Sequence, residues 1–554
     1  MAKWRLLEPE AEVVSELARE AGIDALCARV LANRGVIPEA ASGFLSPSLK
    51  TIAAPEEEVW RVAARRVARA VKDGERIGVF GDYDTDGITS AAVLYLALSR
   101  YTNNLIVKLP TRQTGYGFLE PYVRDLFAES VDLVVTADCG ISNRAGVELA
   151  KSLGMDVIVT DHHIPPEAPP EAPPAVAVLD PKLWDPADPL AGVGVAWKFA
   201  WAVARELEDP DGKRHIGRLL DLVSIGTIVD IAPLIGDNRA LAWMGLRYMN
   251  GCLRTGEARP GIEALVKVAG VRGALDEGDL GWKLGPRLNS IGRIKHAGPA
   301  LDLLLTDDPR EAFRIASQLN KLNSERQQRT RHAVASAMAE VDPEEDFKVV
   351  VSEETGGLAG LVAGRVAGAT GRPAVVLNRR VDGSYGGSAR AGETDVDLYG
   401  ALFAVRHLLG EWGGHRKAAG LSIGPGNFDA FVAGVNEAVR AQFEENPEIL
   451  EPPIEVDAEV PLESLANGLL DWLERLAPFG SGNYRPVFVS EGLRVQSARQ
   501  LWEGMNLLIL EGGAQAKLAG PPDLVPEGTF DAAYSVSRNA YSGGAELEIL
   551  DWRV

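Results

Sequence analysis

The sequence predicts an α/β protein: a doubly wound parallel sheet, a long connecting helix, a second α/β domain and a C-terminal β-domain. Three observations predict this class. Short apolar strands alternate with helical segments from residue 76 to about 180, including a helix over 90–100. The segment 305–341 has helical spacing and few helix breakers, and the last residues alternate between polar and apolar. This final alternation indicates a small antiparallel barrel or sandwich.

The chain has 554 residues, which is too long for one hydrophobic core. An acidic stretch with prolines, EENPEILEPPIEVDAEV, indicates a linker before the last domain. We therefore expect an N-terminal helical segment, a first α/β domain, the connecting helix, a second α/β domain and the β-domain, with the limits 1–54, 55–300, 301–344, 345–445 and 446–554.

Composition narrows the class of protein. The net charge of −21 argues against a broadly basic surface that coats nucleic acid, although it leaves room for a local basic groove. Cys27, Cys139 and Cys252 are too far apart for a CxxC metal site and are odd in number. No run of 18 apolar residues occurs, and the N-terminus turns acidic before any apolar segment develops, so we expect a cytoplasmic protein that does not contact a membrane.

The stretch VFGDYDTDGITS at 79–90 places Asp82, Asp84 and Asp86 directly before Gly87. A D-x-D-x-D-G run also begins an EF-hand calcium loop, which needs a glutamate at its twelfth position and a helix before it. Here the twelfth residue is Val93, and the preceding ERIGVF is typical of a strand. The run is therefore predicted to be an acidic turn between a strand and a helix.

Further acids follow other apolar segments. Asp138 comes after LVVTA, the run Asp161-His162-His163 comes after VIVT, and Asp230 lies within LLDLVSIGTIVDIAPL. Because ligands of doubly wound sheets bind beyond the carboxyl ends of the strands, we expect these residues to meet at one edge. Carboxylates with imidazole suit Mn²⁺ or Mg²⁺, and there are enough ligands for two ions. Two such ions promote phosphoester hydrolysis.

The motifs GDYDTDG, TADCG, VTDHH and GTIVDIAPL resemble those of the DHH phosphoesterase superfamily, and GGHRKAAG at 413–420 resembles the signature of its DHHA1 partner domain. AGVGVAWK, LGPRLNSIGR, LNKLNSER and PFGSGNYRPVF further resemble the RecJ family of single-strand-specific 5′→3′ DNA exonucleases. The similarity extends from about residue 55 to the C-terminus. It implies DHH and DHHA1 domains, a C-terminal OB-fold barrel, and degradation of single-stranded DNA to mononucleotides in DNA repair and recombination.

The resemblance also implies roles for individual residues. Asp138, His162 and Asp230 are implied to be catalytic, and the ligands of two Mn²⁺ or Mg²⁺ ions are implied to be Asp82, Asp84, Asp86, Asp138, His162 and Asp230. Asp161 and His163 are ligands or support the ligands. The implied phosphate and nucleic-acid contacts are Arg112, Tyr116, Arg287, Asn289, Arg293, Ser388, Arg390 and His415. In the barrel, Trp502, Tyr534 and Tyr541 either stack on bases or pack in the core.

The family further implies single-stranded DNA as partner, a monomer, and a single-strand-binding protein and a RecQ-type helicase as candidate protein partners. Two positions depart from its pattern. Phe80 stands where many DHH proteins have a histidine, and the second α/β domain has no Trp-His pair before the glycines of EETGGLAGLVAGRVA. Two alternatives remain: an enzyme for short oligoribonucleotides or cyclic dinucleotides, and a non-catalytic scaffold. Every acid of the motifs is present, which disfavours the scaffold.

Overall fold

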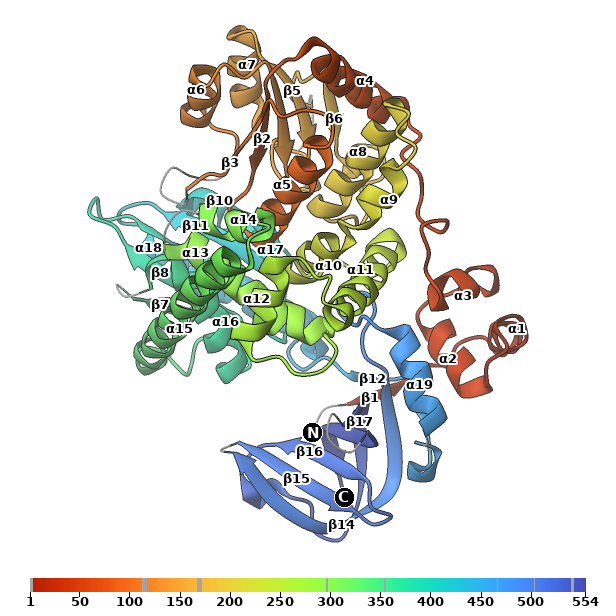
Figure 1. Ribbon diagram of the computed structural model, residues 1–554. Coiled ribbons are helices and arrows are strands. Elements are labelled where there is room, and N and C mark those ends of the chain that lie inside the picture. The colour runs from red at the N-terminus through yellow and green to blue at the C-terminus, as the bar shows by residue number, and fades with distance from the viewer. Residues whose placement is uncertain are drawn as a thin grey trace.

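The computed structural model contains two α/β lobes, a barrel and a small N-terminal helical unit (Figure 1). The structure describes residues 3–111, 115, 117–166, 172–294, 297–352, 355–465, 467–502, 504–539 and 543–554, without the side chains of Ile291, Arg293, Ile294 and Asn467. Within these ranges, no helix combines the length and apolarity needed to cross a membrane.

The first lobe is built on a five-stranded parallel sheet with the order β3-β2-β4-β5-β6. Its strands are β2 (Ile77–Gly81), β3 (Leu105–Lys108), β4 (Leu133–Ala137), β5 (Asp156–Thr160) and β6 (Ala177–Leu179). One face packs against α6 (Glu120–Ala128) and α7 (Arg144–Ser152), and the other against α4 (Glu58–Asp73), α5 (Thr85–Leu98) and α8 (Gly192–Glu206) (Figure 1). Helices on both faces explain the apolar strands and confirm the doubly wound sheet.

The order of the strands creates a crevice at one edge of this sheet. β2 pairs with β3 on one side and with β4 on the other. The helices that follow β2 and β4 consequently cover opposite faces, and the carboxyl ends of these two strands are left open. The acidic segments begin there.

Further helices extend the first lobe beyond the sheet: α9 (Gly212–Gly217), α10 (Leu220–Val229), α11 (Gly236–Thr255), α12 (Pro260–Ala269), α13 (Gly285–Ile294) and α14 (Gly298–Leu305). The predicted connecting helix is α15 (Pro309–Ala339), which has 31 residues. Its first half packs in the core of the first lobe through Ile315 and Leu319, and its second half packs in the next lobe through Ala333 and Ala337. One rigid element therefore joins the lobes.

The second lobe has a mixed sheet with the order β10-β11-β9-β8-β7. Its strands are β7 (Lys348–Val351), β8 (Ala374–Arg379), β9 (Tyr385–Arg390), β10 (Leu409–His415) and β11 (Ala418–Ile423). Helix α16 (Ala359–Thr370) covers one face together with the end of α15, while α17 (Leu398–Ala404) and α18 (Phe428–Glu445) cover the other.

The C-terminal domain is a closed five-stranded barrel. Strand β14 (Val487–Trp502) is long enough to pair with both β15 (Met505–Leu510) and β17 (Thr529–Arg538), and β16 (Gln515–Ala519) and β18 (Ala545–Arg553) complete the circle. Of the aromatics considered for stacking, Tyr534 is fully buried and bonded to Ser490, so that interpretation was wrong for it. Trp502 is exposed, and Tyr541 lies outside the described residues.

The N-terminal segment packs on the C-terminal domain rather than on the sheet that follows it. Helices α1 (Ala11–Ala21), α2 (Ala25–Asn33) and α3 (Pro38–Leu45) share a core with α19 (Asn467–Leu476) and the barrel, in which Leu17 and Leu31 lie with Trp472 and Phe488. Strand β1 (Trp4–Leu6) pairs with β12 (Ile454–Val456), and both chain ends lie at the barrel (Figure 1). The ends of the sequence therefore form one unit.

Arg239 on α11 connects this unit to the first lobe. Its guanidinium is 3.6 Å from the ring of Phe44 and donates to the carbonyls of Phe44 at 2.5 Å and Leu476 at 2.9 Å. Burial lowers the pKa of Arg239 to about 9, and no described acid pairs with it. The carbonyl dipoles of two distant segments, α3 and α19, compensate for the burial of its charge.

We expect Arg239→Met to destabilise the protein by about 2–4 kcal/mol, because buried carbonyls of α3 and α19 lose their donor. Thermal unfolding followed by circular dichroism measures the effect. Arg247→Met is the matched control, since Arg247 lies exposed on the same helix with its guanidinium 4.6 Å from the ring of Trp243. Equal melting temperatures for the two variants would show that Arg239 does not hold the units together.

Candidate active site

The turn after β2 places three carboxylates close together. Asp84 is the N-cap of α5, and its Oδ1 accepts the N–H of Gly87 at 3.0 Å. A Cβ on Gly87 would lie 2.6 Å from the backbone of Asp82, so the tightness of the turn depends on this glycine. Asp82 is buried and Asp84 is half-buried.

Asp86 is held by the N-terminus of α8. The N–H groups of Gly192 and Val193 each donate to its carboxylate at 2.9 Å, where the helix dipole also favours an anion. Burial and the neighbouring Asp84 nevertheless raise the pKa of Asp86 to about 7. Gly192 lies against a second acid, because a Cβ there would be 2.5 Å from Oδ1 of Asp138.

Asp138 follows β4 in a left-handed conformation with φ 62°, which is uncommon for a residue with a side chain. Its N–H donates to the carbonyl of Thr160, the last residue of β5. Such a conformation persists only where the surroundings enforce it, and it is typical of functional sites. It directs the carboxylate toward the other acids.

The three residues of the Asp161-His162-His163 run have different roles. Asp161 accepts the backbone N–H groups of Ile141, His162 and His163, and its Oδ1 lies 2.8 Å from Nδ1 of His163. Burial opposes ionisation of Asp161, but the hydrogen bond and charge of His163 together with the N–H of Ile141 outweigh it and lower the pKa of Asp161 to about 2. Asp161 thus organises the turn and orients His163.

His162 points into the acid cluster. Its Nε2 lies 3.2 Å from Asp138, 3.7 Å from Asp86 and 3.9 Å from Asp230. Burial and the charge of His163 lower the pKa of His162 to about 3, so the ring is neutral and able to bind a metal.

Asp230 reaches the cluster from a helix. The segment before it was counted among those that bring acids to the sheet edge, yet it is α10, whose C-terminal residue Val229 directly precedes Asp230. The helix approaches closely because Gly226 has no Cβ, which would be 2.3 Å from Oγ1 of Thr89 on α5. The sequence did not distinguish the two, because a buried apolar helix and a buried strand have similar composition.

Among the described residues, candidate ligand atoms lie within 4.8 Å of one another in three overlapping groups: Asp82, Asp84 and Asp138; Asp86, His162 and Asp230; and Asp138, His162 and His163. Burial and mutual repulsion raise the pKa of Asp82, Asp138 and Asp230. Buried Oδ1 atoms of Asp82 and Asp138 have no hydrogen-bond partner among the described residues. Unpaired carboxylate oxygens beside a neutral imidazole fit divalent cations such as Mn²⁺ or Mg²⁺.

Comparison with known proteins agrees with this geometry. Three family models match: the DHH family N-terminal domain at 76–227, the DHHA1 domain at 346–441 and the RecJ OB domain at 456–550. The single-stranded-DNA-specific exonuclease RecJ of Escherichia coli is 33% identical over 99% of this chain and 98% of its own length. The chain belongs to the RecJ family.

Other RecJ proteins extend the comparison. The Bacillus subtilis RecJ is 33% identical over 90% of this chain, which spans 63% of that relative's length. Crystal structures of Thermus thermophilus RecJ in complex with Mn²⁺ and with Mg²⁺ superpose with TM-scores of 0.84 and 0.78, at 30% and 28% identity. Both superpositions cover 100% of this chain, and they cover 79% and 78% of the Thermus protein. The predicted order of DHH, DHHA1 and OB domains is confirmed.

The residues predicted to bind phosphate fall into two regions. Ser388 and Arg390 lie on β9 of the second lobe, and Arg390 is desolvated, which lowers its pKa, without an ion pair to any described acid. On α13, Arg287 bonds Asn320, and Oδ1 of Asn289 accepts the N–H of Thr85. Asn289 therefore supports the acidic turn. Arg112 and Tyr116 lie outside the described residues, as does the side chain of Arg293.

Lys182 is a residue that the RecJ motifs did not reveal. Its Nζ donates to the carbonyl of His162, and its charge acts on His162, Asp230 and His415. Its place in the sequence could have revealed it, because Lys182 follows the strand β6 and therefore lies at the same sheet edge as the acids.

Phe80, which stands where many DHH proteins have a histidine, faces away from the metal groups. Its ring is fully buried 5.2 Å from the rings of Phe118 and Tyr122. It thus packs the face of the sheet under α6, and Asp82 takes part in the acid group instead.

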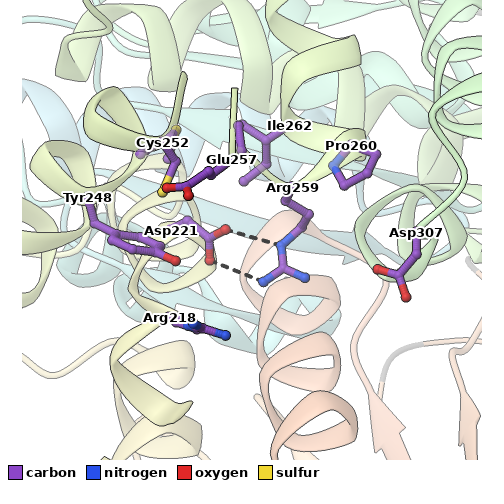
Figure 2. Close-up of a pocket in the computed structure, with 11 residues that line it drawn as sticks. Arg218, Asp221, Tyr248, Cys252, Glu257, Arg259, Pro260, Ile262 and Asp307 are labelled. Carbon is purple, nitrogen blue, oxygen red and sulfur yellow. Dashed lines mark hydrogen bonds and ion pairs between the residues drawn. The ribbon is translucent and has the colours of Figure 1, made fainter. Parts of the chain in front are cut away.

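A different pocket, of about 540 Å³, opens beside α11 and α12 (Figure 2). Its carboxylate Asp221 is paired with Arg259 through contacts of 3.1 and 3.4 Å. Asp221 lies near the N-terminus of α10 and Asp230 follows its C-terminus, about 13 Å away at 1.5 Å per residue. The pocket is therefore separate from the acid cluster, and its ion pair is satisfied internally.

We expect Gly192→Ala to lower Mn²⁺ affinity at least tenfold, because the added Cβ would meet Asp138 and displace the α8 N-terminus from Asp86. Isothermal titration calorimetry measures the binding. Gly251→Ala is the control, since that helical glycine has open space around its Cβ position and alanine favours helices. Unchanged Mn²⁺ affinity in a folded Gly192→Ala protein would contradict the close contact described.

Proposed function

We propose that the protein is a metal-dependent exonuclease that degrades single-stranded DNA 5′→3′ to mononucleotides by two-metal phosphodiester hydrolysis. The observation that carries the proposal is the pair of carboxylate groups joined through Asp138 and His162 at the crevice of the first lobe. The exonuclease name printed for the relatives supports the substrate class.

In this proposal Asp82, Asp84 and Asp138 would hold one ion, and Asp86, His162 and Asp230 would hold the other. When bound, two divalent ions supply electrostatic stabilisation of the attacking and leaving oxygens of an in-line displacement. Asp161 keeps His163 oriented and charged, since their contact raises the pKa of His163 to about 9 despite its burial. Asp138, His162 and Asp230 are the proposed catalytic residues.

The reaction adds water across one phosphodiester. A water oxygen bonds to phosphorus, the bond from phosphorus to O3′ of the terminal nucleotide breaks, and O3′ takes a proton. Lys182, whose charge acts on both His162 and His415, and His415 itself are proposed to contact the scissile phosphate. The shortened strand keeps the phosphate at its new 5′ end, so every product strand has the same kind of terminus as a 5′-phosphorylated substrate.

Strand polarity requires a group that recognises the terminus, because in-line hydrolysis is indifferent to direction. Arg390 is suited to this role, since a desolvated guanidinium without a carboxylate partner pairs strongly with phosphate. Ser388 lies two residues away on the same face of β9. Arg287 and Arg293 on α13, together with Arg112 and Tyr116, are proposed as further contacts along the strand.

The cellular setting stays a prediction. We propose a role in DNA repair and recombination, a cytoplasmic location and a monomeric state, with a single-strand-binding protein and a RecQ-type helicase as partners. The domain limits of 55–300, 345–445 and 446–554 are likewise proposed.

Asp138→Ala should reduce hydrolysis of a labelled single strand to less than a few per cent, because one oxygen donor near both metal groups is lost. Binding of the same strand, measured by fluorescence anisotropy, should change little since the arginines remain. Asp185→Ala, at an exposed position of the same lobe, serves as control. Substantial residual hydrolysis at saturating Mn²⁺ would contradict the metal assignment.

Arg390→Ala should reduce both the rate and the preference for a 5′-phosphorylated over a 5′-hydroxyl strand, each by about tenfold, because a charged contact to phosphate is removed. Gel analysis of both substrates gives the two rates. Arg379→Ala, exposed on neighbouring β8, should leave the preference unchanged. Label released first from the 3′ end would refute the polarity, and an unchanged preference would refute the role of Arg390.

A further inference from the structure

A cleft of about 1070 Å³ lies between the lobes, directly beside the metal groups. His163 and Ile164 line it from the first lobe, and Tyr399, Trp412 and His415 line it from the second. Ligand pockets typically measure roughly 300–1,000 Å³, so the cleft has room for a nucleotide. His163 is shared with one of the candidate metal groups, which makes the cleft continuous with the proposed reaction centre.

A cluster of aromatic rings on the second lobe reaches the wall of this cleft through Tyr399 and Trp412. Tyr399 and Phe403 are four residues apart on α17, and their rings are stacked with centroids 6.3 Å apart. Trp412 on β10 lies 5.2 Å from Tyr399 and 6.4 Å from Phe403. The guanidinium of Arg406 is 4.0 Å from the ring of Phe403. The cluster therefore offers ring faces together with a cation.

Core packing accounts for only part of this arrangement, because Trp412 is half-buried against the second-lobe core. Tyr399 is 37% exposed and Phe403 is 47% exposed, while the core of the second lobe is closed by Leu398, Leu402 and Phe431. Helix α17 thus buries its leucines and directs its aromatics outward. Gly413 and Gly414 follow Trp412 in the cleft wall and have no side chains to obstruct a flat ligand.

We propose that the cleft is a nucleobase-binding subsite in which Tyr399 and Trp412 stack on a base adjacent to the scissile phosphate. The subsite rests on the proposed exonuclease function, and it assigns the position of one base of the bound strand. Stacking on aromatic faces tolerates every base, which suits an enzyme that must remove nucleotides in any order. Asn143 and Ser142, on the opposite wall, provide polar groups for the base edge or sugar.

The test uses 5′-phosphorylated 12-nucleotide strands that contain one abasic residue at position 1, 2 or 3. With the full chain and Mn²⁺, kcat/KM should fall about tenfold for one abasic position and little for the others, because one stacking contact is lost. Tyr399→Leu should lower kcat/KM about tenfold on the intact strand and leave it unchanged on that abasic strand. Trp412→Phe, which keeps a ring, should retain most of the activity on both.

Phe127→Leu is the control for loss of an exposed aromatic, because Phe127 lies in the last turn of α6, at the opposite edge of the sheet and before β4 begins. Fluorescence anisotropy in EDTA compares the equilibrium binding of the same strands to the same variants. The subsite is therefore tested even if no strand is hydrolysed. Absence of hydrolysis would count against the proposed function alone. Equal losses of Tyr399→Leu on intact and abasic strands, or no sensitive abasic position in the wild-type protein, would overturn the subsite.

Discussion

Repulsion among clustered carboxylates is the constraint on which the first lobe depends. Asp82, Asp86 and Asp138 are buried at one sheet edge, and burial raises the pKa of each. Such a group persists only if backbone dipoles and cations offset the repulsion. The N-terminus of α8 faces Asp86, and Asp161 keeps a charged His163 nearby. The remaining unpaired oxygens are those that a metal would satisfy.

This constraint accounts for much of the local architecture. Gly87, Gly192 and Gly226 lie where a Cβ would collide with the turn, with Asp138 or with Thr89. Helices α5, α8 and α10 pack closely on one another as a result, and each brings a different acid or a backbone donor to the same point. Small residues are thus used at the site to bring charge together, at a cost in conformational entropy that the surrounding core offsets.

The two lobes together form the walls of the cleft beside the site. Helix α15 belongs to both cores and sets the spacing of the lobes, which leaves the cleft lined by His163 and His415. The N-terminal helices and the barrel form one unit, held to the first lobe through Arg239. In the proposed complex, a strand in the cleft would meet surfaces from parts of the chain separated by hundreds of residues.

The sequence by itself determined the fold class, the family and most of the acid cluster, because motifs at strand ends follow from local geometry and chain order. Helix α5 was expected at residue 90 but begins at Thr85, since the N-cap bond of Asp84 extends it. The helical origin of Asp230, the burial of Tyr534, the support role of Asn289 and the presence of Lys182 were decided by the tertiary structure. These four features depend on which distant segment packs against a residue, and composition and periodicity carry no information on that contact. The same reason explains the aromatic wall: Tyr399 and Trp412 meet only because α17 and β10 fold together and face the other lobe.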